Sequence, residues 1–274
     1  MTDAIVSRIS GPVVSASGLE GAQMFDVVRI GELGLMGEII RLEGGKATIQ
    51  VYEDTSGLRP GEKVTNTKRP LSMQLGPGLL TSIYDGIQRP LDILRAQSGD
   101  FISRGNIIPA LDQKKKWEFV PIKKKGEQVS PGEIIGEVDE TPLIKHKIMI
   151  PYNVTGELSE ISEGSYTVDE IVAAVKTNST KVDIGLSSWW TVRTPRPVLR
   201  KLPPEEPLLT GQRVLDTFFP IAKGGTGAIP GPFGSGKTVT QQQLAKWADS
   251  NVIVYVGCGE RGNEMTEVLS TFPK

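Results

Sequence analysis

One stretch of the sequence, Gly231-Pro232-Phe233-Gly234-Ser235-Gly236-Lys237-Thr238, decides the fold class, because it matches the pattern Gly-x-x-x-x-Gly-Lys-Ser/Thr in full. Glycines let a backbone curl until successive N–H groups converge on phosphate oxygens. Such a loop leads into a helix N-terminus, where exposed N–H groups and the positive end of the helix dipole attract anions. The pattern therefore predicts a phosphate-binding loop between a strand and a helix.

Four residues of this loop lead to specific predictions about how it binds phosphate and how it is shaped. The Lys237 ammonium would place a positive charge near the β- and γ-phosphates of a nucleotide, and the Thr238 hydroxyl would reach Mg²⁺. Pro232 has no N–H to donate to a phosphate, and Phe233 is bulky where many such loops have a small residue. We expect both to stiffen or reshape the loop, with packing of Phe233 into the core as the alternative.

The residues around this loop predict an alternating α/β arrangement. A short apolar stretch ends at Ile229 before the loop, and a helix is expected from Lys237 to Ala248. The run Val252–Val256 is continuous, apolar and rich in β-branched residues, which is typical of a parallel strand buried on both faces. A second helix is expected to start near Asn263. The residues of the first helix that are expected to face inward are Leu244, Ala245, Trp247 and Ala248.

A second motif, Cys258-Gly259-Glu260-Arg261-Gly262-Asn263-Glu264-Met265, follows the expected strand at its C-terminal end, where ligands bind in open α/β sheets. The Glu260 carboxylate would orient or deprotonate the water that attacks a γ-phosphate, and Arg261 would counter the charge. Two alternatives stay open for Glu260, an acid that holds Mg²⁺ and a helix-capping residue. We favour the water-positioning role because Gly257, Cys258 and Gly259 separate Glu260 from the strand, whereas a magnesium-holding acid normally follows the strand directly.

The composition excludes several classes of protein. The 274 residues predict about two domains. Lys plus Arg number 31 and Asp plus Glu 32, which argues against binding nucleic acid through bulk positive charge. The sequence has no apolar run of about 18 residues and no basic-then-apolar N-terminal signal. The single cysteine excludes an internal disulfide and a Cys-rich zinc site, and the single histidine leaves little for a His-based metal centre; a reducing, cytoplasmic setting fits.

The rest of the chain divides by its pattern into several parts. Residues 1–70 predict a small closed β-barrel, because short strands recur between glycine turns. Residues 71–112 change character, with a helix expected within Leu79–Ile87. Residues 113–190 predict a β-rich insertion, and the prolines of 191–210 predict an extended connector. The strands expected in the barrel are Ile5–Ser10, Phe25–Ile30, Met36–Arg41 and Ala47–Tyr52.

The insertion contains two stretches that echo each other, Lys125–Val138 and Gly156–Val172. They resemble the two halves of a biotinyl or lipoyl carrier sandwich, in which a hairpin between the halves presents a modified lysine. The candidate segment in this sequence is Lys145-His146-Lys147-Ile148-Met149, which lacks both the acidic residue before the lysine of lipoyl carriers and the Met-Lys-Met of biotin carriers. We therefore favour a β-rich docking module over a carrier function.

Together, the two motifs resemble those of the catalytic A subunit of archaeal A-type and vacuolar-type rotary ATPases. The stretches Ile83–Leu91, Leu209–Asp216 and Phe219–Gly225 are also similar to this family, and the resemblance covers essentially the whole chain. It implies an α/β fold with additional β domains. These are an N-terminal small β-barrel (1–70), a RecA-like P-loop nucleotide-binding domain of which only the first part is present (71–112 and 191–274), and a β-rich bulge insertion (113–190).

The resemblance also implies a function. The family interconverts ATP with ADP and phosphate, coupled to proton or sodium movement across a membrane, with ATP or ADP and Mg²⁺ bound at the site. Implied partners are a non-catalytic B subunit in an alternating ring, central and peripheral stalk subunits and, indirectly, a membrane sector, with no nucleic acid. The implied location is peripheral, on the cytoplasmic side of the cell membrane.

By position, the resemblance gives each site residue a role. It implies that Lys237, Glu260 and Arg261 are catalytic and that Thr238 holds Mg²⁺. The implied nucleotide-binding residues are Gly231, Pro232, Phe233, Gly234, Ser235, Gly236, Lys237, Thr238 and Val239.

Members of this family are considerably longer, so we expect the chain to be C-terminally truncated. The Walker-B acid and the adenine pocket would then lie beyond Lys274, and the chain alone is expected to be inactive. Two other hypotheses stay open. One is another RecA-like ATPase, of secretion or helicase type, and the other is a non-enzymatic nucleotide-binding or assembly module.

Overall fold

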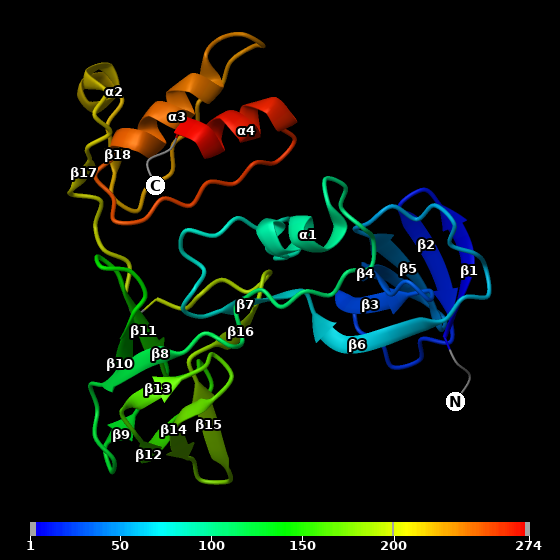
Figure 1. Ribbon diagram of the computed structural model, residues 1–274, viewed down its shortest axis with the longest axis horizontal. Helices are drawn as coiled ribbons and strands as arrows, with labels where there is room; N and C mark the ends of the chain where they lie inside the picture. Colours follow the sequence, from blue (N-terminus) through cyan, green and yellow to red (C-terminus); the bar gives the residue numbers. More distant parts are fainter. Residues whose placement is uncertain (1–3, 199, 272–274) are drawn as a thin grey trace. The chain divides into compact units, whose positions relative to one another are not determined.

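The computed structural model describes residues 4–198 and 200–271 of the chain (Figure 1). These residues form two compact units, Met1–Arg196 and Pro197–Lys274. The first unit is built almost entirely from strands, and the second holds three of the four helices. Residues 71–112 lie in the first unit, although we expected them to belong with 191–274. That grouping therefore stays a proposal.

The first unit begins with a six-stranded antiparallel sheet in the order β1-β2-β5-β4-β3-β6. The sheet closes on itself, because the Val64 N–H donates to the Ala4 carbonyl at 2.7 Å and the Val6 N–H donates to the Glu62 carbonyl at 2.8 Å. Closure joins the two outer strands of the sheet, and the expected small barrel is confirmed. The strands are β1 (Ile5–Ser10), β2 (Val13–Ser17), β3 (Asp26–Ile30), β4 (Leu35–Glu43), β5 (Lys46–Val51) and β6 (Val64–Pro70), around a core that includes Val14, Val28, Ile30, Leu35, Ile39 and Ile49.

The helix expected within Leu79–Ile87 is wrong. That segment consists of turns, and the helix of this region is α1 (Leu91–Ser98), which begins directly after Pro90. The reason is the side chain of Asp85, which accepts hydrogen bonds from the Ile87 and Arg89 N–H groups and stabilises a turn. The apolar residues of the segment therefore serve a loop, and proline marks the true helix start.

Arg89 lies at the centre of a buried ion-pair network that ties this turn to the barrel. Its guanidinium contacts Asp85 Oδ2 at 2.7 Å and Glu53 Oε1 at 2.8 Å. The three side chains are between 7% and 15% exposed. Glu53 also accepts a hydrogen bond from the Gly105 N–H at 3.1 Å. A single arginine thus neutralises two carboxylates that are shielded from water.

Replacing Arg89 by alanine is therefore expected to lower the free energy of unfolding by about 3–5 kcal/mol, because the substitution removes the cation that pairs with both buried carboxylates, Glu53 and Asp85. Urea unfolding followed by tryptophan fluorescence measures this loss. Arg95→Ala is the matched control, since Arg95 is 78% exposed and pairs with Asp100 only at 3.6 Å. The control should stay within about 0.5 kcal/mol of the parent. Equal effects of the two substitutions would show that the network does not stabilise the fold.

The second half of the first unit is a sandwich of two four-stranded antiparallel sheets, in the orders β11-β10-β8-β13 and β15-β14-β12-β9. Phe119, Ile135, Leu158 and Val175 are fully buried between them. This arrangement agrees with the β-rich insertion that the sequence predicts. The strands are β8 (Trp117–Pro121), β9 (Gln128–Val129), β10 (Ile134–Asp139), β11 (Lys145–Met149), β12 (Gly156–Ile161), β13 (Gly164–Tyr166), β14 (Ile171–Lys176) and β15 (Lys181–Gly185).

Two further strands pair the start of this half with its end. β7 (Ser72–Leu75) runs antiparallel to β16 (Ser188–Thr191), so the segments that enter and leave the sandwich lie side by side. Beyond β16, the Arg193 guanidinium reaches the barrel and pairs with the buried carboxylate of Glu38, its Nε lying 3.2 Å from Oε1. Glu38 also accepts a hydrogen bond from the Tyr52 hydroxyl at 3.1 Å. Burial and the Glu38 charge together raise the pKa of Tyr52 to about 12.

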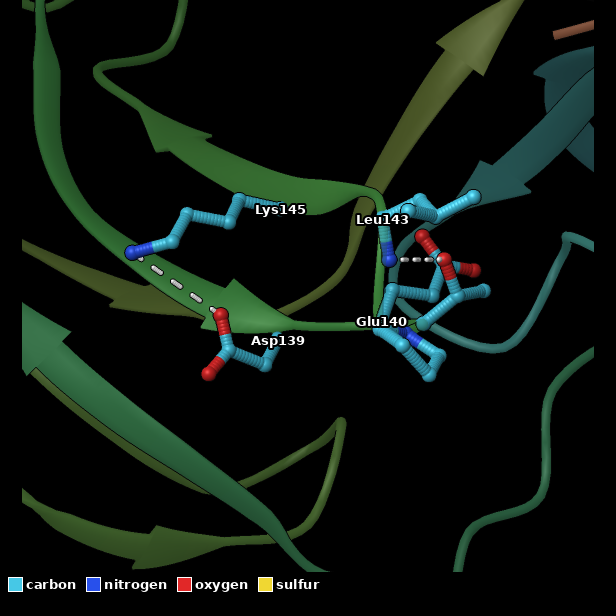
Figure 2. Close-up of a pocket in the computed structure, with 6 residues that line it drawn as sticks. Asp139, Glu140, Leu143 and Lys145 are labelled. Atoms are coloured by element: carbon cyan, nitrogen blue, oxygen red, sulfur yellow. Dashed lines mark hydrogen bonds and ion pairs between the residues drawn. The ribbon is translucent and has the colours of Figure 1, made fainter. Parts of the chain in front are cut away.

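The β10–β11 hairpin holds Lys145, the first lysine of the candidate carrier segment (Figure 2). Lys145 lies in strand β11 opposite Asp139, and its ammonium pairs with Glu137 and, at 3.9 Å, with Asp139. Glu140 accepts hydrogen bonds from the Gly78 and Leu80 N–H groups at 2.7 and 3.1 Å. These contacts pin the hairpin to residues outside the sandwich and engage Lys145 in ion pairs.

The second unit contains a short antiparallel pair, β17 (Pro207–Leu208) with β18 (Ile221–Ala222), and three helices. They are α2 (Arg213–Phe218), α3 (Lys237–Trp247) and α4 (Gly262–Thr271). α3 and α4 confirm both helices that the sequence predicts here. The expected inward face of α3 is only partly right, because Trp247 is 65% exposed, whereas Leu244, Ala245 and Ala248 are partly buried.

The parallel strand expected at Val252–Val256 is wrong for the part of the chain that the structure describes. The segment has no strand assignment, and Val254 and Val256 are 82% and 76% exposed. No strand is found at the apolar stretch ending at Ile229 either. A strand needs hydrogen-bonding neighbours, and in this unit the described residues pair only β17 with β18. Among the described residues, no helix is long and apolar enough to cross a bilayer.

Candidate functional site

The loop 231–236 leads directly into α3, and its glycines allow the tight curve that the sequence predicts. Gly234 and Gly236 adopt φ of 77° and 82°, in the left-handed region that residues with a Cβ rarely enter. At Gly231, a Cβ would lie only 2.4 Å from Ser235 Oγ. Each glycine of the motif is therefore required by backbone conformation or by close approach.

Hydrogen bonds within the loop hold its shape. The Ser235 hydroxyl donates to the Pro232 carbonyl at 2.8 Å, and the Ser235 N–H donates to the same oxygen at 3.3 Å. The Lys237 ammonium folds back over the loop and donates to the carbonyls of Gly231 and Pro232 at 2.7 and 2.8 Å. Pro232 thus contributes an acceptor where it cannot contribute a donor. The ammonium lies across the loop, where a phosphate group would meet it.

The N-terminus of α3 presents donors beside this ammonium. The first hydrogen bond of the helix runs from the Thr240 N–H to the Gly236 carbonyl at 2.9 Å. The N–H groups of Lys237, Thr238 and Val239 have no acceptor within the helix, because the carbonyls four residues earlier lie outside it. They are available to an anion, with the positive end of the helix dipole behind them. Thr238, the second residue of α3, is half-buried.

The second motif forms a tight turn before α4. Gly259 has a φ of 71°, and at Gly257 a Cβ would lie 2.3 Å from Met265 Sδ, so the segment folds closely back on α4. The Met265 N–H donates to the Arg261 carbonyl at 3.2 Å, which fixes the Arg261 backbone at the helix start. The side chain of Glu260 is exposed. Burial, together with the charges of Glu260 and Glu264, raises the pKa of Tyr255.

The two motifs meet through Arg261 and Phe233. The Arg261 guanidinium carbon lies 4.8 Å from the centroid of the Phe233 ring. Phe233 is 84% exposed, so the alternative in which it packs into the core is wrong. The structure therefore brings Arg261 into contact with the loop 231–238. Sequence reasoning missed the pairing of Phe233 with Arg261, because nothing in either motif indicates a partner in the other.

A neighbouring segment supports the end of α3. The Asp249 N–H donates to the Leu209 carbonyl at 2.8 Å. At Gly211, where φ is 76°, a Cβ would lie 3.0 Å from the Trp247 Cβ. The stretch Leu209–Asp216 therefore packs against the helix that carries Lys237. Within residues 4–198 and 200–271, no group of three or more His, Cys, Asp or Glu side chains is placed to hold a metal ion.

Three family models match successive parts of the chain. Residues 6–68 match the ATP synthase alpha/beta family, beta-barrel domain. Residues 108–193 match the ATPsynthase alpha/beta subunit barrel-sandwich domain. Residues 211–274 match the ATP synthase alpha/beta family, nucleotide-binding domain. All three models describe domains of ATP synthase alpha/beta proteins, and they match three successive ranges of this chain.

Similar proteins agree with these models. The A subunit of the A-type ATP synthase of Thermococcus sibiricus is 62% identical over 98% of this chain and 46% of its own length. The corresponding protein of Methanopyrus kandleri is 60% identical over the same shares. The V-type ATP synthase alpha chain of Acetivibrio thermocellus is 56% identical over 100% of this chain and 47% of its own length. This chain thus spans about half the length of the curated relatives it matches.

A solved structure of the assembled ATPase EscN, from the type III secretion system of enteropathogenic Escherichia coli, has the same fold. It matches with a TM-score of 0.55 at 17% identity, over 99% of this chain and 45% of the EscN chain. This likeness concerns the fold alone, whereas the sequence relatives above specify the branch. The chain belongs to the ATP synthase alpha/beta family, in the branch that holds the A subunits of A-type enzymes and the V-type alpha chains.

Proposed function

We propose that this chain contributes the phosphate-binding site of the catalytic subunit of a rotary A/V-type ATPase or ATP synthase. The whole protein would interconvert ATP with ADP and phosphate, coupled to proton or sodium transport across a membrane. The observation that carries the proposal is the loop 231–236, which accepts hydrogen bonds from the Lys237 ammonium and leads directly into the N-terminus of α3. The names of the relatives, which are ATP synthase subunits, support the same function.

In this proposal, the loop and α3 hold the nucleotide phosphates. Lys237 exchanges its bonds to the Gly231 and Pro232 carbonyls for bonds to the β- and γ-phosphate oxygens, which are stronger because both partners are charged. The Thr238 hydroxyl, an oxygen donor at the start of α3, fits Mg²⁺, which is commonly held by few protein oxygens together with substrate phosphates. Bound there, Mg²⁺ would neutralise charge that develops on the phosphates.

The turn before α4 would supply the groups that act on the γ-phosphate. Glu260 is proposed to accept a proton from the attacking water or to orient it, and Arg261 to bind the phosphate charge. The contact of Arg261 with Phe233 supports a location of this turn beside the loop. The exposed side chain of Glu260 is free to face a substrate.

The proposed surroundings are those of a rotary machine. The protein would alternate with a non-catalytic B subunit in a ring, contact central and peripheral stalk subunits, and couple indirectly to a membrane sector. Its location would be peripheral, on the cytoplasmic side of the membrane. An arginine from the neighbouring subunit would complete the site and raise kcat about 10³- to 10⁵-fold.

Calorimetric titration of the protein with the magnesium complexes of ATP, ADP and AMP tests the proposal. We expect ATP and ADP to bind and AMP to bind at least about a hundredfold more weakly, because AMP lacks the phosphates that Lys237 and the loop would hold. Adenosine serves as the control for binding through the base. Equal binding of all four compounds, or binding of none, would favour a non-enzymatic assembly module.

A further inference from the structure

The contact between Phe233 and Arg261 involves an aromatic side chain that is largely exposed to solvent. Phe233 is 84% exposed at the apex of the loop, where an apolar ring gains little from burial. The Arg261 guanidinium carbon lies over this ring, 4.8 Å from its centroid. That distance lies within the range in which the ring's quadrupole attracts a cation. The ring thus has one evident partner among the described residues, a positive charge from the second motif.

The backbones on both sides of the contact are fixed. The bonds from Ser235 to the Pro232 carbonyl hold the turn that carries Phe233. The bond from the Met265 N–H to the Arg261 carbonyl fixes the start of α4. The long side chain of Arg261 would otherwise sample many rotamers, since it is exposed. The ring selects among those rotamers the ones that direct the guanidinium toward the loop.

We propose that Phe233 is a positioning residue that holds Arg261 beside the phosphate-binding loop before nucleotide binds. This inference rests on the proposed function and adds a role for Phe233. A guanidinium that stacks on an aromatic face keeps N–H donors for other partners, so Arg261 binds the γ-phosphate of ATP while it stays in contact with the ring. The ring lowers the cost of ordering Arg261 and does not itself touch the reacting atoms.

A loop that only needs an apolar, bulky residue would explain Phe233 differently. Leucine distinguishes the two explanations, because it keeps the apolar bulk and removes the aromatic face. Tryptophan makes the converse change: it alters the size of the side chain but keeps an aromatic face, the one that attracts a cation most strongly. The proposal predicts that Phe233→Trp preserves MgATP affinity and that Phe233→Leu does not.

A double-mutant cycle in the full-length protein within its assembled enzyme tests this role. Phe233→Leu is expected to weaken MgATP binding about two- to fivefold, the effect of one exposed cation–π contact. In an Arg261→Ala background, the same substitution is expected to change the affinity by less than about 1.5-fold, because the partner is gone. MgADP affinity should change less than MgATP affinity, since MgADP lacks the γ-phosphate.

Either of two results would overturn the positioning role: the same loss from Phe233→Leu in both backgrounds, or no loss when Arg261 is intact. A comparable loss from Phe233→Trp would also contradict it. Thermal unfolding of each variant identifies a loss that comes from misfolding. Lys237→Ala, measured in parallel, separates the two proposals. If Lys237→Ala binds MgATP like the parent, the proposed function fails. If Lys237→Ala weakens MgATP binding but Phe233→Leu has the same effect with and without Arg261, only the role of Phe233 is overturned.

Discussion

Replacing Lys237 by alanine is expected to abolish ATP turnover and to weaken MgATP binding by a factor of about 10²–10⁴. The ammonium reaches across the loop to the Gly231 and Pro232 carbonyls, so the same atom can reach a phosphate held there. Losing charge-assisted hydrogen bonds costs about 1.5–3 kcal/mol each, and two such bonds account for the expected factor. The experiment is done in the full-length protein within its assembled enzyme, with calorimetry for binding and phosphate release for turnover.

Lys246→Ala is the matched control for this prediction. Lys246 lies in the last turn of the same helix, α3, so its loss removes the same charge from the same element without touching the loop. Affinity and turnover of the control should stay close to those of the parent enzyme. Parent-like turnover in Lys237→Ala would refute the assignment of the loop 231–238 as the phosphate site.

Replacing Glu260 by glutamine is expected to leave MgATP affinity nearly unchanged and to lower turnover about 10²- to 10⁴-fold, the contribution of a positioned general base. The amide keeps the size of the carboxylate but cannot accept the proton of the attacking water. Glu260 is exposed at the turn before α4, so the substitution should have little effect on stability. Single-turnover hydrolysis, combined with equilibrium binding of MgATP, separates the chemical step from affinity.

Glu264→Gln serves as the control, because Glu264 lies in the first turn of α4, four residues after Glu260. Three roles of Glu260 predict different outcomes. A magnesium-holding acid would lose MgATP affinity together with turnover, and a helix-capping residue would lose stability. Substantial turnover in Glu260→Gln with normal stability would contradict the role as a base.

Local patterns in the sequence predicted much of this fold. Alternating strands between glycine turns predicted the barrel, and hydrogen bonds between Val64 and Ala4 close it. The loop motif predicted that α3 begins at Lys237, where it does begin. Both predictions succeeded because the decisive information lies within a few residues: left-handed glycines, a helix start, and apolar residues on one face.

Other elements could not be predicted locally because their neighbours decide them. The apolar residues of Leu79–Ile87 favoured a helix, but the Asp85 side chain bonds the backbone of the turn and Arg89 extends that turn into an ion-pair network with Glu53. The run Val252–Val256 has the composition of a strand, but it has no strand assignment among the described residues and is largely exposed. Composition indicates a tendency to form a strand, and hydrogen-bonding partners decide whether the strand forms.

The sequence by itself determined the chemical groups of the proposed site: the glycines at 231, 234 and 236, the ammonium of Lys237, the hydroxyl of Thr238, the carboxylate of Glu260 and the guanidinium of Arg261. Only the tertiary structure decided that Phe233 points outward and carries the Arg261 guanidinium on its ring. The physical reason is range. Backbone conformation and helix starts depend on adjacent residues, whereas the contact between the two motifs depends on how the chain folds between them.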